Sequence, residues 1–238
     1  MLIPLRNYSN YSICESNIKI DDLVNFAEKE KLPAMALTDY KLLSGALEFS
    51  TKCKNKGIQP IIGLDVDYIS KLNHKSRLTF LCKNEIGFKN LNILSTKINT
   101  ENEFHLSLDN INNFSEGNIL ILGGLFSYFQ DLNINTNNLK IIIHEITALK
   151  NFFKNDVFFE FDENLDNKPL NEISKKSKIN SFLSSFSFYK QEKDYDAIKI
   201  LHCLKNGEYL QNTSFNLKNN YSLAYINQEN NNLIPLIK

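Results

Sequence analysis

The residues of this sequence that could do chemistry are a few carboxylates and scattered histidines. Asp39 ends one short apolar run, and Asp65 and Asp67 end another. Carboxylates hold a cluster of catalytic metal ions only when several imidazoles or further carboxylates converge on them. The spacings H-x-H, H-x-x-E-H and H-E-x-x-H are missing among the four histidines, which are His74, His105, His144 and His202. The residue types therefore argue against a metal-dependent hydrolase.

Other motifs that carry chemistry are equally weak. The Gly123-Gly124 pair is an isolated turn, because a phosphate-binding loop needs the pattern G-x-x-x-x-G-K-[ST]. The cysteines have no C-x-x-C spacing, which indicates reduced thiols and no zinc knuckle. They are Cys14, Cys53, Cys82 and Cys203.

Composition and charge describe an ordinary globular chain. Hydrophobic residues make up 42% of the 238 residues, enough for a sizeable core. Lys and Arg total 27, as do Asp and Glu, so we expect weak or absent DNA contact through this chain. We find no signal peptide and no apolar run of about 20 residues, the length that a membrane helix requires. These features predict a cytoplasmic protein that does not contact membranes.

Short apolar runs alternate with amphipathic stretches along the chain, which is typical of an α/β fold with a parallel sheet. We predict one domain over residues 1–238, with a barrel to about residue 207 and a tail or linker over 208–238. In such folds the functional residues lie at the carboxyl ends of the strands. The predicted parallel strands cover residues 34–37, 60–66, 78–81, 119–122, 157–161 and about 181–185.

A series of motifs carries a family resemblance. They are LRNYSNYS (5–12), LPAMALTDY (32–40), SGALEF (44–49), GIQPIIGLD (57–65), LTFLCKN (78–84) and GFKNL (87–91). In this order and spacing the chain resembles the PHP domain at the N-terminus of the bacterial DNA polymerase III alpha subunit. The resemblance is dense over residues 1–100, thins over 101–160 and can be followed to about Gly207. It implies a distorted (β/α)7 barrel in which parallel strands alternate with helices.

The resemblance also implies where metal ligands would lie in members that hydrolyse phosphoesters. Only Asp65 keeps ligand chemistry there, with Asp39 as a second carboxylate of the former pocket. We therefore expect a degenerate metal site, no catalytic residue, no bound metal and no cofactor. A salt bridge between Asp65 and Arg77 is a candidate replacement for the metal. The former ligand positions are Tyr8, Asn10, Tyr40, Asp65, Arg77, Leu125, Phe186 and Phe188.

Three functions remain open from the sequence. The first is a catalytically silent scaffold domain of the polymerase, whose partners are the rest of the alpha chain and the proofreading exonuclease subunit. The second is a metal-dependent phosphoesterase with an altered site, for which His74 would be a displaced ligand. The third is a free-standing degenerate PHP binding protein. By resemblance, the parent chain of the first would be a DNA-directed DNA polymerase, a nucleotidyltransferase, although this domain alone would be inactive.

Overall fold

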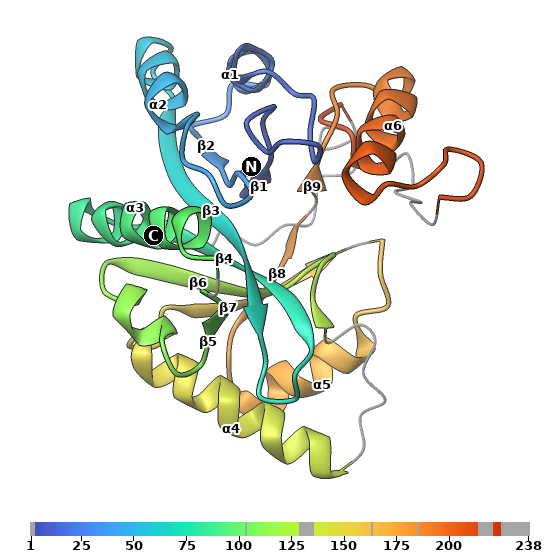
Figure 1. The fold of residues 1–238 in the computed structure, drawn as a ribbon. Coiled ribbons are helices and arrows are strands. Elements are labelled where there is room, and N and C mark those ends of the chain that lie inside the picture. The colour runs from blue at the N-terminus through green and yellow to red at the C-terminus, as the bar shows by residue number, and fades with distance from the viewer. Residues whose placement is uncertain are drawn as a thin grey trace. The chain divides into compact units, whose positions relative to one another are not determined.

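The computed structural model describes residues 3–102, 104–128, 136–162, 164–184, 186–213 and 221–224. The chain divides into two compact units, each with its own set of elements (Figure 1). Unit 1 combines Met1–Ile62 with Ser185–Lys238, and unit 2 is the intervening Gly63–Ser184. The chain therefore leaves unit 1 after its first 62 residues and returns to it near the end.

Unit 1 is built on short parallel strand pairs. Strand β1 pairs with β9, and β2 pairs in parallel with the first residues of β3. In the β1–β9 pair, Arg6 lies opposite Phe186, although the two residues are far apart in the sequence. The elements are β1 (Arg6–Asn7), α1 (Ile20–Lys29), β2 (Ala34–Leu37), α2 (Ala46–Asn55), the start of β3 (Gln59–Ile69), β9 (Phe186–Ser187), the 3-10 helix η3 (Glu192–Asp194) and α6 (Tyr195–Asn206).

The core of unit 1 forms where α1 and α2 cover β2. Helix α1 places Leu23, Val24 and Ala27 on one buried face, at the spacing of an amphipathic helix. Phe49 of α2 and Leu223 belong to the same buried cluster. Leu223 donates its backbone N–H to the Tyr189 carbonyl at 2.8 Å, so part of the segment assigned to a tail packs into this core. Residues 214–220 and 225–238 of that segment lie outside the described residues.

Unit 2 is a twisted sheet with strand order β3–β4–β6–β7–β8, to which β5 adds beside β3. Strands β6, β7 and β8 run parallel to one another, as the sequence predicts. The elements are the remainder of β3, β4 (Lys75–Cys82), α3 (Glu85–Thr100), β5 (Leu106–Ser107), the 3-10 helix η1 (Ile111–Phe114), β6 (Asn118–Gly123), α4 (Thr136–Phe152), β7 (Val157–Asp162), α5 (Lys168–Ser177) and β8 (Ser181–Ser184).

The direction of β4 differs from the prediction. It pairs antiparallel with both β3 and β6, so the expectation of a parallel strand at residues 78–81 is wrong. Only residues 70–74 separate β3 from β4, and Ser70 donates its N–H to the His74 carbonyl at 3.0 Å. A parallel neighbour would need a crossover of a dozen or more residues, which this loop does not provide. Antiparallel pairing follows.

Within the described ranges, every helix is too short or too polar to cross a membrane.

Candidate functional site

Tyr8 lies at the centre of an aromatic stack in unit 1. Its ring centroid is 4.8 Å from that of Phe188 and 6.4 Å from that of Phe186, and both pairs are nearly parallel. All three side chains are at most 1% exposed. The pairing of β1 with β9 brings them together, because Tyr8 directly follows β1 while Phe186 begins β9. Three of the positions that the resemblance assigns to former ligands thus form a packed, apolar contact whose side chains carry no metal-binding atom except the Tyr8 hydroxyl.

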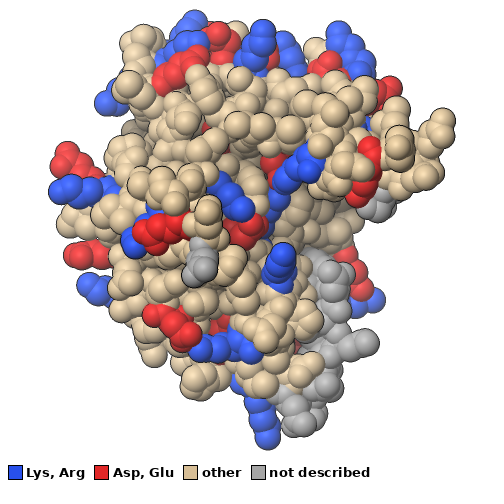
Figure 2. Space-filling model, in the orientation of Figure 1, with Lys and Arg blue, Asp and Glu red and all other residues tan. Residues whose placement is uncertain are grey.

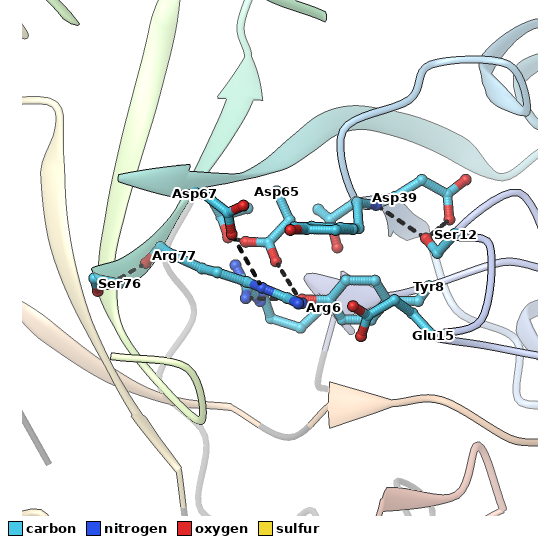
Figure 3. Close-up of polar contacts among 12 residues, drawn as sticks. Arg6, Tyr8, Ser12, Glu15, Asp39, Asp65, Asp67, Ser76 and Arg77 are labelled. Carbon is cyan, nitrogen blue, oxygen red and sulfur yellow. Dashed lines mark hydrogen bonds and ion pairs between the residues drawn. The ribbon is translucent and has the colours of Figure 1, made fainter. Parts of the chain in front are cut away.

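Arg6 adds a positive charge to this stack. Its guanidinium donates to the Tyr8 hydroxyl at 3.2 Å (Figure 3). It also lies 4.5 Å from the Phe186 ring centroid. A buried cation over aromatic faces is favourable, because the ring quadrupole attracts positive charge. Arg6 is only 3% exposed, so this charge is poorly screened by water. A metal cation bound beside Tyr8 would be repelled by it.

The Asp39 carboxylate is used to hold a loop of unit 1. Oδ1 accepts from the Ser9 backbone N–H and the Ser12 hydroxyl, each at 2.6 Å, and Oδ2 accepts from the Ser9 hydroxyl at 2.7 Å. Figure 3 shows the contact with Ser12. Burial raises the pKa of Asp39 above its usual value, and the three donors act in the opposite direction. Because both oxygens are engaged, Asp39 ties residues 9–12 to the end of β2.

Asn10 and Tyr40 have different surroundings. Asn10 is exposed, and its backbone N–H donates to the Ile18 carbonyl at 2.7 Å. Two ammonium groups contact the Tyr40 ring, with Lys41 Nζ 4.7 Å and Lys205 Nζ 5.0 Å from its centroid. Tyr40 therefore makes cation–π contacts with two lysines, an arrangement that does not resemble a metal-ligand pocket.

Asp65 and Arg77 form a buried ion pair across the β3–β4 ladder in unit 2. Arg77 NH1 lies 3.7 Å from Asp65 Oδ2, and Thr79 donates its hydroxyl to Asp65 Oδ1 at 2.7 Å. Asp65 is fully buried, whereas Asp67, 3.8 Å from Arg77 Nε, is half exposed (Figure 3). The predicted salt bridge is therefore confirmed. The Arg77 guanidinium supplies Asp65 with a positive partner.

Leu125 and the turn before it complete the surroundings of Arg77. The Phe126 ring centroid is 4.0 Å from the Arg77 guanidinium carbon, and Arg77 donates its N–H to the Phe126 carbonyl at 3.1 Å. Leu125 and Phe126 line a hollow of about 410 Å³ in unit 2 together with Arg77. Gly123 has φ +102°, and a Cβ there would lie 2.4 Å from the Glu160 carbonyl oxygen, so only glycine allows this turn.

The residues present do not fit a metal cluster. Among the described residues, we find no group of three or more His, Cys, Asp or Glu side chains placed to hold an ion. The Asp39 carboxylate accepts hydrogen bonds from two serines, and the Asp65 carboxylate pairs with Arg77 and accepts from the Thr79 hydroxyl. Phenylalanine and leucine have no donor atoms to replace the missing imidazoles. The described residues therefore offer no site for a metal cluster.

Sequence reasoning missed a buried carboxylate in unit 2. Glu145 of α4 is 1% exposed and accepts from the Tyr68 hydroxyl at 2.5 Å and the Tyr128 hydroxyl at 3.5 Å. The backbone N–H of Lys71 donates to it at 3.2 Å. Burial raises the pKa of Glu145, and these hydrogen bonds oppose the shift. The charged residue inside the apolar run of α4 was the only signal in the sequence. Glu145 joins α4 to the β3–β4 hairpin.

The raised pKa of Glu145 predicts a pH dependence of stability. Below the pKa of an unfolded glutamic acid, about 4.3, the contribution of Glu145 is fully present. As the pH rises from there through the raised folded-state pKa, Glu145 is deprotonated in the unfolded chain while it still holds its proton in the folded chain. The free energy of unfolding therefore falls over this range. Each pKa unit of the shift corresponds to about 1.4 kcal/mol. Urea unfolding between pH 4 and pH 7 measures this slope.

The matched variants for this pH dependence are Glu145→Gln and Glu116→Gln. Glu145→Gln cannot ionise and should flatten the part of the slope that Glu145 causes. Glu116 is an exposed glutamate of the same unit, so Glu116→Gln should reproduce the wild-type profile. An unchanged slope in Glu145→Gln would show that other groups set the pH dependence.

Comparisons with known proteins identify the family of this chain. The PHP domain family matches residues 4–164. DNA polymerase III subunit alpha of Chlamydia pneumoniae is 36% identical over 66% of this chain and 14% of its own length. The Borreliella burgdorferi subunit is 29% identical over 86% of this chain and 19% of its own, and the Buchnera aphidicola subunit 29% over 92% and 20%. The chain thus spans a fifth or less of these relatives.

Solved structures with low sequence identity share the fold. An amidohydrolase from Chromobacterium violaceum, solved with sulfate, has a TM-score of 0.51 and 12% identity over 78% of this chain and 87% of its own. A proposed metal-dependent phosphoesterase from Bifidobacterium adolescentis has a TM-score of 0.50 and 8% identity over 76% of this chain and 86% of its own. The α/β fold of PHP type expected from the sequence is therefore confirmed. The chain belongs to the PHP domain family and is homologous to the N-terminal region of bacterial DNA polymerase III alpha subunits.

Proposed function

We propose that this chain is a catalytically silent PHP domain of a replicative DNA polymerase III alpha chain, where it acts as a structural scaffold. Homology to alpha subunits supports the polymerase context. The observation that carries the loss of catalysis is the ion pair of Asp65 with Arg77, 3.7 Å apart. A guanidinium satisfies the carboxylate and repels a metal ion at the same time.

The aromatic stack of unit 1 supports the same proposal. Tyr8, Phe186 and Phe188 bury large apolar surfaces against one another, which stabilises a fold but brings no metal ligand. With no hydrolytic chemistry to perform, the domain contributes a folded body to a longer polypeptide. Balanced charge, 27 basic and 27 acidic residues, supports a protein-facing role and leaves strong DNA contact to other parts of the alpha chain.

Docking of the proofreading exonuclease subunit belongs to the same proposal and rests on the resemblance to alpha subunits. Co-sedimentation of the 238-residue chain with that subunit tests whether the two proteins bind. A folded chain that fails to co-sediment would remove this part and leave the scaffold role in place.

The chemical part of the proposal predicts no stoichiometric metal and no turnover. Protein purified without chelator should contain well below one equivalent of zinc or manganese per chain. Hydrolysis of bis(p-nitrophenyl) phosphate should not rise above the buffer rate with either metal added. Metal analysis and the colorimetric assay measure these results.

Two variants separate this prediction from the phosphoesterase alternative. Asp65→Asn removes the remaining ligand-type carboxylate, and His74→Ala removes the histidine nearest to Arg77 in sequence. The His74 ring stacks on Tyr128 at 5.9 Å, a packing contact, so neither variant should change the metal content. Stoichiometric metal with turnover that disappears in Asp65→Asn would show a working site and reject the silent-domain proposal.

A further inference from the structure

Helix α6 carries apolar side chains on two faces. One face packs into unit 1 through Ile198, 1% exposed, and Cys203, 6% exposed. The other face has four apolar side chains at the spacing i, i+3, i+4 and i+7, which places them in one row. We name this row the α6 stripe; it consists of Ala197, Ile200, Leu201 and Leu204. A helix that is apolar on opposite faces is typical of one that packs between two bodies.

Three of the four side chains of the α6 stripe are exposed and Leu201 is half-buried, although the composition of the stripe suits burial. Ile200 is 47% exposed and Leu204 is 71% exposed. The patch continues past Gly207, where Tyr209 is 80% and Leu210 is 49% exposed. The segment after α6, at the right of Figure 1, is largely uncharged in the matching region of Figure 2. An apolar surface that runs from a helix into the following turn marks a contact face.

Hydrogen bonds hold the turn after α6. Glu208 donates its backbone N–H to the Cys203 carbonyl at 2.9 Å, and its carboxylate accepts from the Thr213 hydroxyl at 2.7 Å. Asn212 donates its N–H to the Tyr209 carbonyl at 2.9 Å. Tyr209 is therefore presented by a hydrogen-bonded turn, which lowers the entropic cost of a contact through its ring.

Exposed apolar residues on the other helices do not form such a row. On α3, Ile86 and Ile93 lie on one face, but Lys89 and Asn90 fill the positions between them. On α2, Leu47 is 79% exposed and stands next to Glu48. Single exposed side chains of this kind are normal on protein surfaces. The α6 stripe differs because its positions are apolar without interruption.

We infer that the α6 stripe packs against the polymerase body of the alpha chain, an inference that rests on the proposed function. The relatives that match this chain continue over at least four-fifths of their length outside the matched region. Helix α6 is the last helix among the described residues, so in chain order it is the described helix nearest to that body. The exposed residues Asp196 and Lys205 flank the α6 stripe with opposite charges, so the partner surface is selected by apolar packing rather than by net charge.

Thiol labelling at Leu204 tests this contact. Leu204→Cys is introduced with Cys14→Ser and Cys82→Ser, which remove the two native cysteines that are partly exposed. Its maleimide labelling rate is measured in the 238-residue chain and in the full-length alpha chain. Burial against the polymerase body should slow labelling on the order of tenfold or more in the full-length chain. Leu47→Cys in the same background is the matched control and should label at equal rates in both.

Two results would overturn the inference. Equal labelling of Leu204→Cys in both chains would show that the polymerase body leaves the α6 stripe uncovered. Protection in the 238-residue chain together with a dimer mass in analytical ultracentrifugation would assign the stripe to a second copy instead. The proposed scaffold function is judged separately, by polymerase activity after the domain is destabilised. Each proposal can therefore fail while the other holds.

Discussion

Arg77→Ala should lower the free energy of unfolding by about 3 kcal/mol, because it removes the guanidinium that forms an ion pair with a buried carboxylate. Asp65 is fully buried, and the Arg77 guanidinium lies 3.7 Å from it. The Thr79 hydroxyl would remain as a hydrogen-bond donor at 2.7 Å, but a neutral donor compensates a buried charge only in part. Urea unfolding followed by circular dichroism at pH 7 measures the change.

A double-mutant cycle isolates the pair from its surroundings. Asp65→Asn alone should also destabilise, since it removes the buried carboxylate from its ion pair with the Arg77 guanidinium. The double variant Asp65→Asn/Arg77→Ala should cost less than the sum of the two single changes. Lys83→Ala is the control, because Lys83 pairs with Asp156 at the surface and such pairs contribute about 1 kcal/mol or less. Equal losses for Arg77→Ala and Lys83→Ala would show that the Asp65–Arg77 pair has no special structural role.

Phe186→Ala should have the largest effect on unit 1, a loss of about 3–5 kcal/mol in the free energy of unfolding. The Phe186 ring is fully buried and contacts Tyr8, Phe188 and Tyr221 at centroid distances of 6.4, 6.0 and 6.4 Å. Truncation also leaves a cavity below the Arg6 guanidinium, 4.5 Å from the ring. Thermal and urea unfolding of the purified chain measure the loss.

Phe88→Ala is the matched control for the aromatic stack. Phe88 is 38% exposed on α3, so its truncation should cost about 1 kcal/mol or less. Phe186→Leu keeps most of the buried apolar volume and should recover part of the loss. If Phe186→Ala and Phe88→Ala unfold at the same urea concentration, the stack contributes little to stability.

The same variants test the scaffold role in the full-length alpha chain. Phe186→Ala should lower polymerase activity as the temperature rises, because the domain unfolds earlier, whereas Phe88→Ala should follow the wild-type curve. Unchanged polymerase activity in Phe186→Ala at temperatures where the domain is unfolded would reject the scaffold proposal. Labelling at Leu204 is independent of this result.

The sequence alone determined the positions of the longer strands and the residue types at the positions that the resemblance marks. Runs such as residues 34–37 and 119–122 are apolar and bounded by turn residues, which predicts strands from local pattern. The absence of histidine at the positions implied by the resemblance is also a local fact. The candidate pairing of Asp65 with Arg77 also came from the sequence, because opposite charges at former ligand positions can compensate each other.

Tertiary structure decided what depends on contacts between distant residues. The antiparallel direction of β4 follows from a short hairpin loop, which the apolar pattern of a strand does not encode. The sequence alone does not show that the Asp39 carboxylate is hydrogen-bonded, yet Ser9 and Ser12 donate to both of its oxygens. Tyr68 and Glu145 lie 77 positions apart and meet only once α4 has packed on the hairpin. Periodicity reports which side of an element is apolar, but the partner of a buried polar group is set by packing.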